Sequence, residues 1–262
     1  MKTKPGKAAA AKSPKPGSGG KPRRPGRPSA KANPDQRARL LDAAVALFGE
    51  RGIAATTLRA IAQRAKVTPA LLHYYFASKN SLVETILAER VAPFVAVSVA
   101  PLLTPQASPR ATLRSFLEGH MRNIAANPWM PRLMVREVLS EGGALRDQIH
   151  AQFAMTVAPK MLWLIVSAQR KGEIRTDLNP VLIGVSLISL AVFPFAAAPL
   201  WRSVAASLFE GLPEQTMQNV RTQLAAAKGS FGLVPTTQDD LIEHTLTLFD
   251  SMLEKPRAKS KP

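Results

Sequence analysis

The stretch KVTPALLHYYFASK, residues 66–79, decides how this chain folds and what it can bind. Thr68 followed by Pro69 is typical of a helix start, because a threonine side chain can cap free backbone N–H groups and proline suits the first helical position. The helix that begins there is expected to end near Phe76. Apolar spacing before it indicates another helix, so the sequence predicts helix, tight turn and helix within residues 57–76.

This arrangement is the geometry of a helix-turn-helix, whose second helix enters the major groove of DNA. With about 3.6 residues per turn, Leu72 and Phe76 share a face that can pack on the preceding helices, whereas Ala70 and Tyr74 point away from them. Ordinary helical bundles show the same spacing. The pattern alone therefore leaves two interpretations open, a DNA-reading helix and a surface helix of a bundle.

The rest of the chain also favours helices, and no run alternates polar and apolar residues between hairpin turns, so we expect an all-α fold. A first helix should begin after Asn33, present Leu41, Ala44, Val45 and Phe48 on one face, and stop at Gly52. A helix is expected from Ser78 through Leu87, and further helices are expected over residues 108–127, 128–140, 144–171 with a kink at Pro159, 213–228 and 237–253.

Residues 178–201 are uncharged over 24 positions, long enough to cross a bilayer core of ~30 Å. Prolines at 180, 194 and 199 and polar residues at 179, 186 and 189 interrupt the run. We therefore expect a buried or subunit-interface helix here and no membrane association.

The chain is strongly basic, with 35 Lys and Arg against 18 Asp and Glu and a net charge of +17. Ten of the basic residues lie in residues 1–31 and four in residues 255–262, and neither segment contains an acid. Such tails bury little apolar surface, so we expect residues 1–33 and 255–262 to be disordered and to attract phosphate or anionic lipid. A purely solubilising role for the tails is the other interpretation.

Catalytic signals are missing from the sequence. It has no cysteine, its four histidines are scattered singly, and neither a metalloprotease HExxH nor a GxSxG nucleophile motif occurs. We expect no enzyme activity, no catalytic residue, no metal and no cofactor. The missing cysteines and signal peptide are compatible with a cytoplasmic location.

At this point the residues resemble a known family. The order G-I-x-x-T-T-L-x-x-I-A (52–62) and then V-T-P-x-L-L-H-Y-Y-F-x-S-K-x-x-L (67–82) resembles the DNA-binding domain of the TetR family of bacterial transcriptional regulators. His73 stands where the family usually has tyrosine. Lys66 stands where it commonly has glycine, and a positive φ there would cost roughly 1 kcal/mol.

The resemblance implies a helix-turn-helix domain over residues 34–94 and a helical ligand-binding and dimerisation domain over residues 95–254. It implies that the protein is a homodimer that binds double-stranded, palindromic DNA, usually as a repressor. It also implies a small hydrophobic effector, whose identity the sequence does not reveal. The implied groove contacts are Thr68, Pro69, Ala70, Leu71, His73, Tyr74 and Tyr75, and the implied phosphate contacts are Thr57 and Lys79. RRPGRP, residues 23–28, is similar to a minor-groove AT-hook core and suggests an arm through Arg23, Arg24 and Arg27.

Large soft side chains in the second domain suggest where an effector would bind. The candidate pocket residues are His120, Trp129, Met134, Arg136, Phe153 and Trp163. Core packing is the ordinary role of the apolar members. A sequence-indifferent, nucleoid-type DNA-binding protein that relies on its basic tails is the alternative function.

Overall fold

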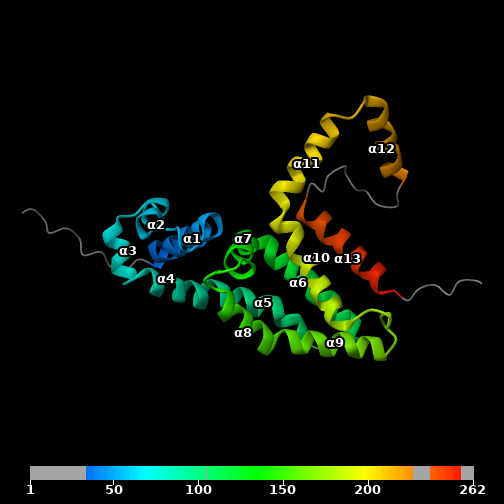
Figure 1. The fold of residues 1–262 in the computed structure, drawn as a ribbon, viewed down its shortest axis with the longest axis horizontal. Coiled ribbons are helices and arrows are strands. Elements are labelled where there is room, and N and C mark those ends of the chain that lie inside the picture. Colours follow the sequence, from blue (N-terminus) through cyan, green and yellow to red (C-terminus); the bar gives the residue numbers. More distant parts are fainter. Residues whose placement is uncertain (1–33, 105, 227–236, 255–262) are drawn as a thin grey trace, which may run out of the picture. The chain divides into compact units, whose positions relative to one another are not determined.

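The computed structural model describes residues 34–104, 106–226 and 237–254, which form α-helices and two short π-helical segments and contain no strand (Figure 1). The all-α prediction is confirmed. The predicted basic tails, the Asn33 cap and the arginines at 23, 24 and 27 lie outside the described residues. The N-terminal elements are α1 (Pro34–Arg51), α2 (Leu58–Arg64), α3 (Pro69–Tyr75), α4 (Lys79–Ile86), the π-helical η1 (Leu87–Val91) and α5 (Ala92–Leu103).

The remaining elements lie close to the helices expected from sequence, except that residues 202–210 of α11 were not predicted to be helical. They are α6 (Pro109–Ala126), α7 (Trp129–Met134), the π-helical η2 (Val135–Leu139), α8 (Arg146–Thr156), α9 (Ala158–Arg170), α10 (Pro180–Ala196), α11 (Ala198–Glu210), α12 (Glu214–Ala226) and α13 (Gln238–Leu253).

Side-chain caps start the short helices where the sequence predicts. The hydroxyl oxygens of Thr57, Thr68 and Ser78 accept hydrogen bonds from backbone N–H groups in the first turns of α2, α3 and α4. Each cap satisfies an N–H group that has no partner within its own helix. The helices next to the α2–α3 turn are therefore defined locally, even though α2 and α3 have seven residues each.

One apolar cluster holds α1 to α4 together. Leu41, Ala44, Val45 and Phe48 of α1 are all buried in it, as predicted, and they meet Leu72 of α3. Phe76, at the end of α3, is buried in the same cluster. The predicted inner face of α3 is thus confirmed, and the opposite face is left for solvent or a partner.

A second cluster surrounds α6, which packs against α5, α9, α10 and α13. Phe116 and Leu117 of α6 are buried there with Ile165 of α9, Leu187 of α10 and Phe249 of α13. Because α6 contacts so many helices, it forms the centre of the C-terminal half of the described chain.

Two helices predicted as continuous are broken. Val157 separates α8 from α9 two residues before Pro159, and α10 is followed by α11 at a bend of 65°. The kink at Pro159 was predicted. The bend between α10 and α11 was not predicted. Of the two alternatives for residues 178–201, a fully buried helix is excluded, because Val181, Leu182, Val185 and Phe193 are exposed.

Some helices are long enough and apolar enough to cross a membrane, judged by length and composition alone. These are the stretches Lys79–Leu103 and Arg146–Arg170, with Pro180–Ala196 and Ala198–Ala205 as a third if that bent pair counts as one. In the first stretch, however, Glu89 and Arg90 pair with charged residues of α1. Charged side chains held against another helical domain argue against placing that stretch in lipid.

The turn between α2 and α3 carries local backbone strain. Lys66 has φ of 56°, in the left-handed region that residues other than glycine enter at a cost. We expect Lys66→Gly to raise the free energy of unfolding by roughly 0.5–1 kcal/mol, as measured by denaturant unfolding. Lys66→Ala is the control, since it removes the charge but keeps the Cβ. Equal stabilisation by both variants would show that charge, not backbone strain, is responsible.

Candidate functional site

The outer surface of α3 is the first candidate site. Tyr74 is 63% exposed, and Thr68, Pro69, Ala70 and His73 are also exposed. Leu71 and Tyr75 are partly buried at the edges of this face, and the Tyr75 ring meets the Tyr74 ring edge-on at 5.3 Å. The structure therefore brings all seven predicted groove residues onto one short helix and its cap.

The charge around this helix is of one sign. Residues 57–79 contain four Lys and Arg and no Asp or Glu. Arg64 is paired with Glu50, whereas Arg59 on α2 and Lys66 in the turn are exposed and form no ion pair among the described residues. The exposed charges of Arg59 and Lys66 attract the phosphates of DNA. The sequence analysis did not predict Arg59 as a phosphate contact, although its position two residues after Thr57 could have suggested that role.

The two predicted phosphate contacts are already engaged in hydrogen bonds. The Thr57 oxygen accepts the N–H of Ala60 at 3.2 Å and keeps its own hydroxyl proton free to donate. The Lys79 ammonium donates to the Ala54 carbonyl at 3.0 Å. An ammonium has three protons, so this bond positions Lys79 at the start of α4 and leaves two donors for a phosphate.

Two arginine–carboxylate pairs attach α1 to η1. Arg37 donates hydrogen bonds through both terminal nitrogens to the two carboxylate oxygens of Glu89, at 2.5 and 2.7 Å. Its guanidinium also lies over the Phe76 ring. The hydrogen bonds raise the pKa of Arg37 and lower that of Glu89. Arg90 donates through two nitrogens to Asp42 at 3.0 and 2.9 Å. Such partly exposed pairs contribute less than about 1 kcal/mol each, but the forked contact of Arg37 with both Glu89 oxygens fixes their relative orientation.

A buried carboxylate attaches the other end of α1 to η2. Glu137 is 5% exposed and accepts the backbone N–H of Ile53 at 2.8 Å and that of Ala144 at 3.1 Å. Gly52, with φ of 88°, turns the chain at this point, and a Cβ there would lie 3.1 Å from the Glu137 carboxylate. Glu137 therefore joins the α1–α2 turn to the C-terminal helices.

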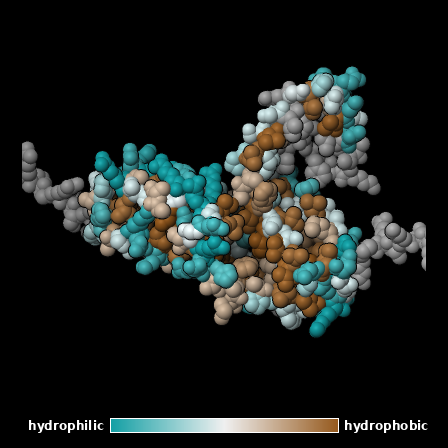
Figure 2. Space-filling model, viewed as in Figure 1, coloured by the Kyte–Doolittle hydropathy of each residue, from teal (hydrophilic) through white to brown (hydrophobic). Residues whose placement is uncertain are grey.

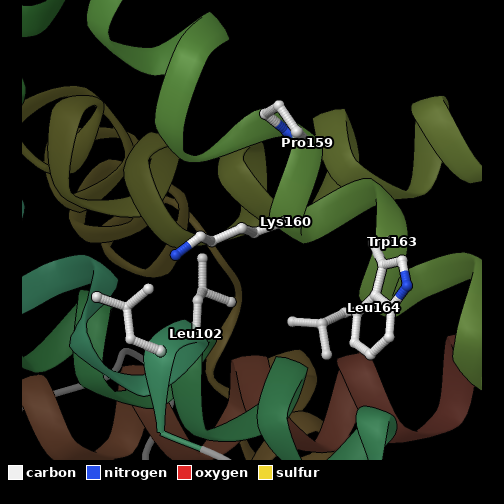
Figure 3. Close-up of a pocket in the computed structure, with 6 residues that line it drawn as sticks. Leu102, Pro159, Lys160, Trp163 and Leu164 are labelled. Atoms are coloured by element: carbon white, nitrogen blue, oxygen red, sulfur yellow. The ribbon is translucent and has the colours of Figure 1, made fainter.

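The six predicted pocket residues are not gathered in one cavity. His120 and Trp129 both lie near Phe94 of α5, with ring centroids 6.0 and 6.1 Å away. Trp163 instead lines a groove between α5 and α9 (Figure 3). Of the others, Arg136 lies beside Gly52, Met134 packs at the edge of the first core, and Phe153 is exposed on α8.

The imidazole of His120 has one buried nitrogen, Nδ1, without a hydrogen-bond partner in the described part of the chain. Its ring stacks on Phe116 at 5.6 Å. Burial lowers the pKa of His120 to about 4, so the ring is neutral at pH 7. A neutral imidazole held on α6 could hydrogen-bond one polar atom of a ligand.

Comparison with known proteins agrees with this geometry. Residues 40–86 match the family model of bacterial regulatory proteins of the tetR family, and residues 109–215 match a tetracyclin repressor-like C-terminal domain. The two matches together span more than half of the chain. The chain belongs to the TetR family.

Individual relatives of the TetR family support the same assignment. The regulator UidR of Escherichia coli is 25% identical over 160 residues, which is 59% of this chain and 76% of UidR. The repressor KstR2 of Rhodococcus jostii is 48% identical over 52 residues, which is 20% of this chain and 26% of KstR2. This match is stronger in identity but covers only 52 residues.

Solved structures show the shared fold. KstR2 of Mycobacterium tuberculosis has a TM-score of 0.62 at 18% identity, with 88% of this chain and all of that chain covered. PfmR of Thermus thermophilus, also of the TetR family, has a TM-score of 0.57 at 19% identity, with coverages of 85% and 97%. These structures share the fold of this chain, and the family matches identify it as a TetR-family transcriptional regulator with a helix-turn-helix and a helical C-terminal domain.

We expect Glu137→Ala to lower the free energy of unfolding by on the order of 2 kcal/mol, because it leaves buried N–H groups without an acceptor. Denaturant unfolding would measure the change. Glu141→Ala is the matched control, since Glu141 is exposed two residues after η2. A cost for Glu137→Ala no larger than that of the control would mean that water replaces the carboxylate and that the attachment is weak.

Proposed function

We propose that this protein is a dimeric, ligand-responsive regulator, acting as a repressor, that binds a palindromic DNA operator through α3. The observation that carries this proposal is the two-sided character of α3. Its inner side is fixed by buried Leu72 and followed by buried Phe76, while Tyr74 and the small Ala70 face outward. A rigid helix with such an outer face fits the major groove.

Each predicted residue then has a role at the DNA. Ala70 lets the backbone of α3 approach base edges, Leu71 is placed for a thymine methyl, and Tyr74 and His73 donate hydrogen bonds to a base or a phosphate. Thr68, Pro69 and Tyr75 shape the rim of the contact. Thr57 and Lys79 hold phosphates on either side, joined by Arg59, and the basic arm of residues 23–27 lies along the minor groove or backbone.

The surface formed by α10 and α13 supports a homodimer. Val181, Val185 and Phe193 are exposed at four- or eight-residue intervals on α10, and Leu248 and Met252 are exposed four residues apart on α13. The two helices contact each other, and Figure 2 shows hydrophobic residues gathered over this part of the chain. A second copy that adds its own α10 and α13 would cover both stripes in a four-helix bundle.

Dimerisation explains how the operator is recognised and released. Two α3 helices must sit about one turn of DNA, ~34 Å, apart to enter successive major grooves. The continuous stretch α4–η1–α5 connects the helix-turn-helix to the C-terminal helices, and its pairs with α1 transmit any change in its tilt. A small hydrophobic effector that binds better to one tilt would change the spacing and so the affinity for DNA.

Names of the relatives fit this proposal. KstR2 is called a transcriptional repressor and a ketosteroid transcriptional regulator, and UidR a transcriptional regulator. A repressor of this kind acts in the cytoplasm, without a membrane and without catalysis. The side chains of residues 34–104, 106–226 and 237–254 form no group of three or more His, Asp or Glu that could hold a metal ion.

We expect Tyr74→Ala to weaken binding to the operator about tenfold while binding to random duplex changes little, because a base contact contributes ~1–3 kcal/mol only at its cognate site. Fluorescence anisotropy with DNA from around the protein's own gene and with random duplex, over a salt series, would measure both affinities.

Deleting residues 1–33 is the paired experiment. It should weaken both affinities and flatten their salt dependence, because it removes phosphate contacts that carry no sequence information. Equal losses on both DNAs for Tyr74→Ala would remove α3 as the reader. A wild-type protein that prefers no site in a genome-wide binding search would favour the alternative, a sequence-indifferent nucleoid-type protein that binds through its tails.

The dimer surface gives a separate prediction. Val185→Asp should raise the dimer dissociation constant by ~10-fold or more, since a carboxylate would be buried between apolar helices without a partner. Leu139→Asp is the matched control, because Leu139 is equally exposed but lies on η2. Sedimentation equilibrium would report the result, with circular dichroism to verify folding. If Val185→Asp stays as dimeric as the control, the subunits meet elsewhere.

A further inference from the structure

An open groove lies between the end of α5 and the beginning of α9. Its volume is about 390 Å³, and it is lined by Leu102 and Leu103 of α5 and by Pro159, Lys160, Trp163 and Leu164 of α9 (Figure 3). This size lies within the range of small-molecule sites, which begins near 300 Å³. The groove is separate from the surroundings of His120 and Trp129, which lie against Phe94 further back on α5.

The lining combines apolar walls with a single charge. Lys160 is the one charged residue among those that line the groove, and it forms no ion pair within the described residues. Trp163 is 67% exposed although it is the largest apolar side chain present. In Figure 3 the Lys160 side chain extends toward Leu102, while the indole of Trp163 lies at the opposite end of the groove.

We propose that this groove binds a small amphipathic monoanion with an apolar body and a carboxylate head. The body would cover Trp163, Leu164 and the two leucines of α5, where it removes exposed apolar surface from water. The head would accept hydrogen bonds from the Lys160 ammonium, which can only donate. A neutral ligand of the same shape would leave that ammonium partly desolvated without an acceptor, and a cation would be repelled by it.

The position of the groove connects it to DNA binding, and this step rests on the proposed function. The helix α5 also packs on α6, where a Cβ at Gly119 would lie 3.4 Å from Pro101, an ordinary van der Waals distance. Pro101 also lacks the N–H that would hold the last turn of α5 to the turn before it. A ligand inserted between α5 and α9 would therefore bend or tilt this end of α5, and α5 continues through η1 into α4.

The test is calorimetric titration of the full-length protein with decanoate and decyltrimethylammonium, each below its micelle-forming concentration, and with decanol below its solubility limit. We expect decanoate to bind most tightly, by ~5-fold or more over decanol, as fits one partly exposed ion pair. Lys160→Gln should remove this preference and leave decanol binding unchanged. Lys171→Gln, which removes an exposed lysine at the other end of α9, should leave the preference intact.

Several results would overturn the inference. They are no binding of any of the three probes, equal binding of decanoate and decanol to the wild type, and a decanoate preference that survives Lys160→Gln. A Trp163→Ala variant provides a second measurement, because it should weaken decanoate and decanol alike by ~5-fold or more through lost apolar contact. Unchanged binding of both probes would place the ligand elsewhere.

Operator binding is measured separately, so the two proposals can fail independently. Specific operator binding without decanoate tests the regulator, and calorimetry without DNA tests the groove. If decanoate binds through Lys160 and weakens operator affinity only in proteins that keep Lys160, both stand. If it binds but leaves operator affinity unchanged, the binding site stands and its coupling to α3 is refuted.

Discussion

The buried carboxylate of Glu137 is the contact on which the position of the helix-turn-helix depends. It accepts the N–H of Ile53 just after α1 and the N–H of Ala144 just before α8, so a single side chain joins three segments. Gly52 makes this possible in two ways, because its backbone takes a positive φ and because it lacks the Cβ that would crowd the carboxylate. The α2 and α3 helices follow directly after this turn, so the direction of the turn sets how they are oriented.

The other end of α1 is attached differently, and the difference matters for how the protein could move. Arg37–Glu89 and Arg90–Asp42 are partly exposed pairs, which water can replace at little cost, whereas Glu137 is buried and cannot lose its partners cheaply. Both attachments end on π-helical segments, η1 and η2. Such segments often mark functional positions. Moving α1 at its η1 end would therefore cost less free energy than moving it at its η2 end, where Glu137 is buried.

Much of the fold follows from local signals in the sequence, and the site follows only in part. Thr57, Thr68 and Ser78 cap the expected helices, and Lys66 takes the left-handed backbone that the family resemblance led us to expect in this turn. These features act within a few residues. Glu137 was missed because its partner Ile53 lies 84 residues away. The six predicted pocket residues do not share one cavity, because large apolar side chains in a sequence do not reveal which of them converge. The bend after α10 was missed for the same reason, since Pro194 and Pro199 restrict the helix without fixing the angle between its parts.

Two groups of exposed apolar side chains have surroundings that indicate different partners. On α10 and α13 they form stripes along two adjacent helices with no charge between Val181 and Phe193, which suits a long apolar surface such as the same helices of a second copy. Between α5 and α9 they line a concave site with one ammonium at its edge. A flat helix of a second subunit would not fill that hollow or neutralise Lys160, whereas a small molecule with an apolar body and one negative charge would do both. Both surfaces are apolar, so hydropathy alone does not distinguish them. Their charge and curvature do, and they indicate a second subunit at one surface and a ligand at the other.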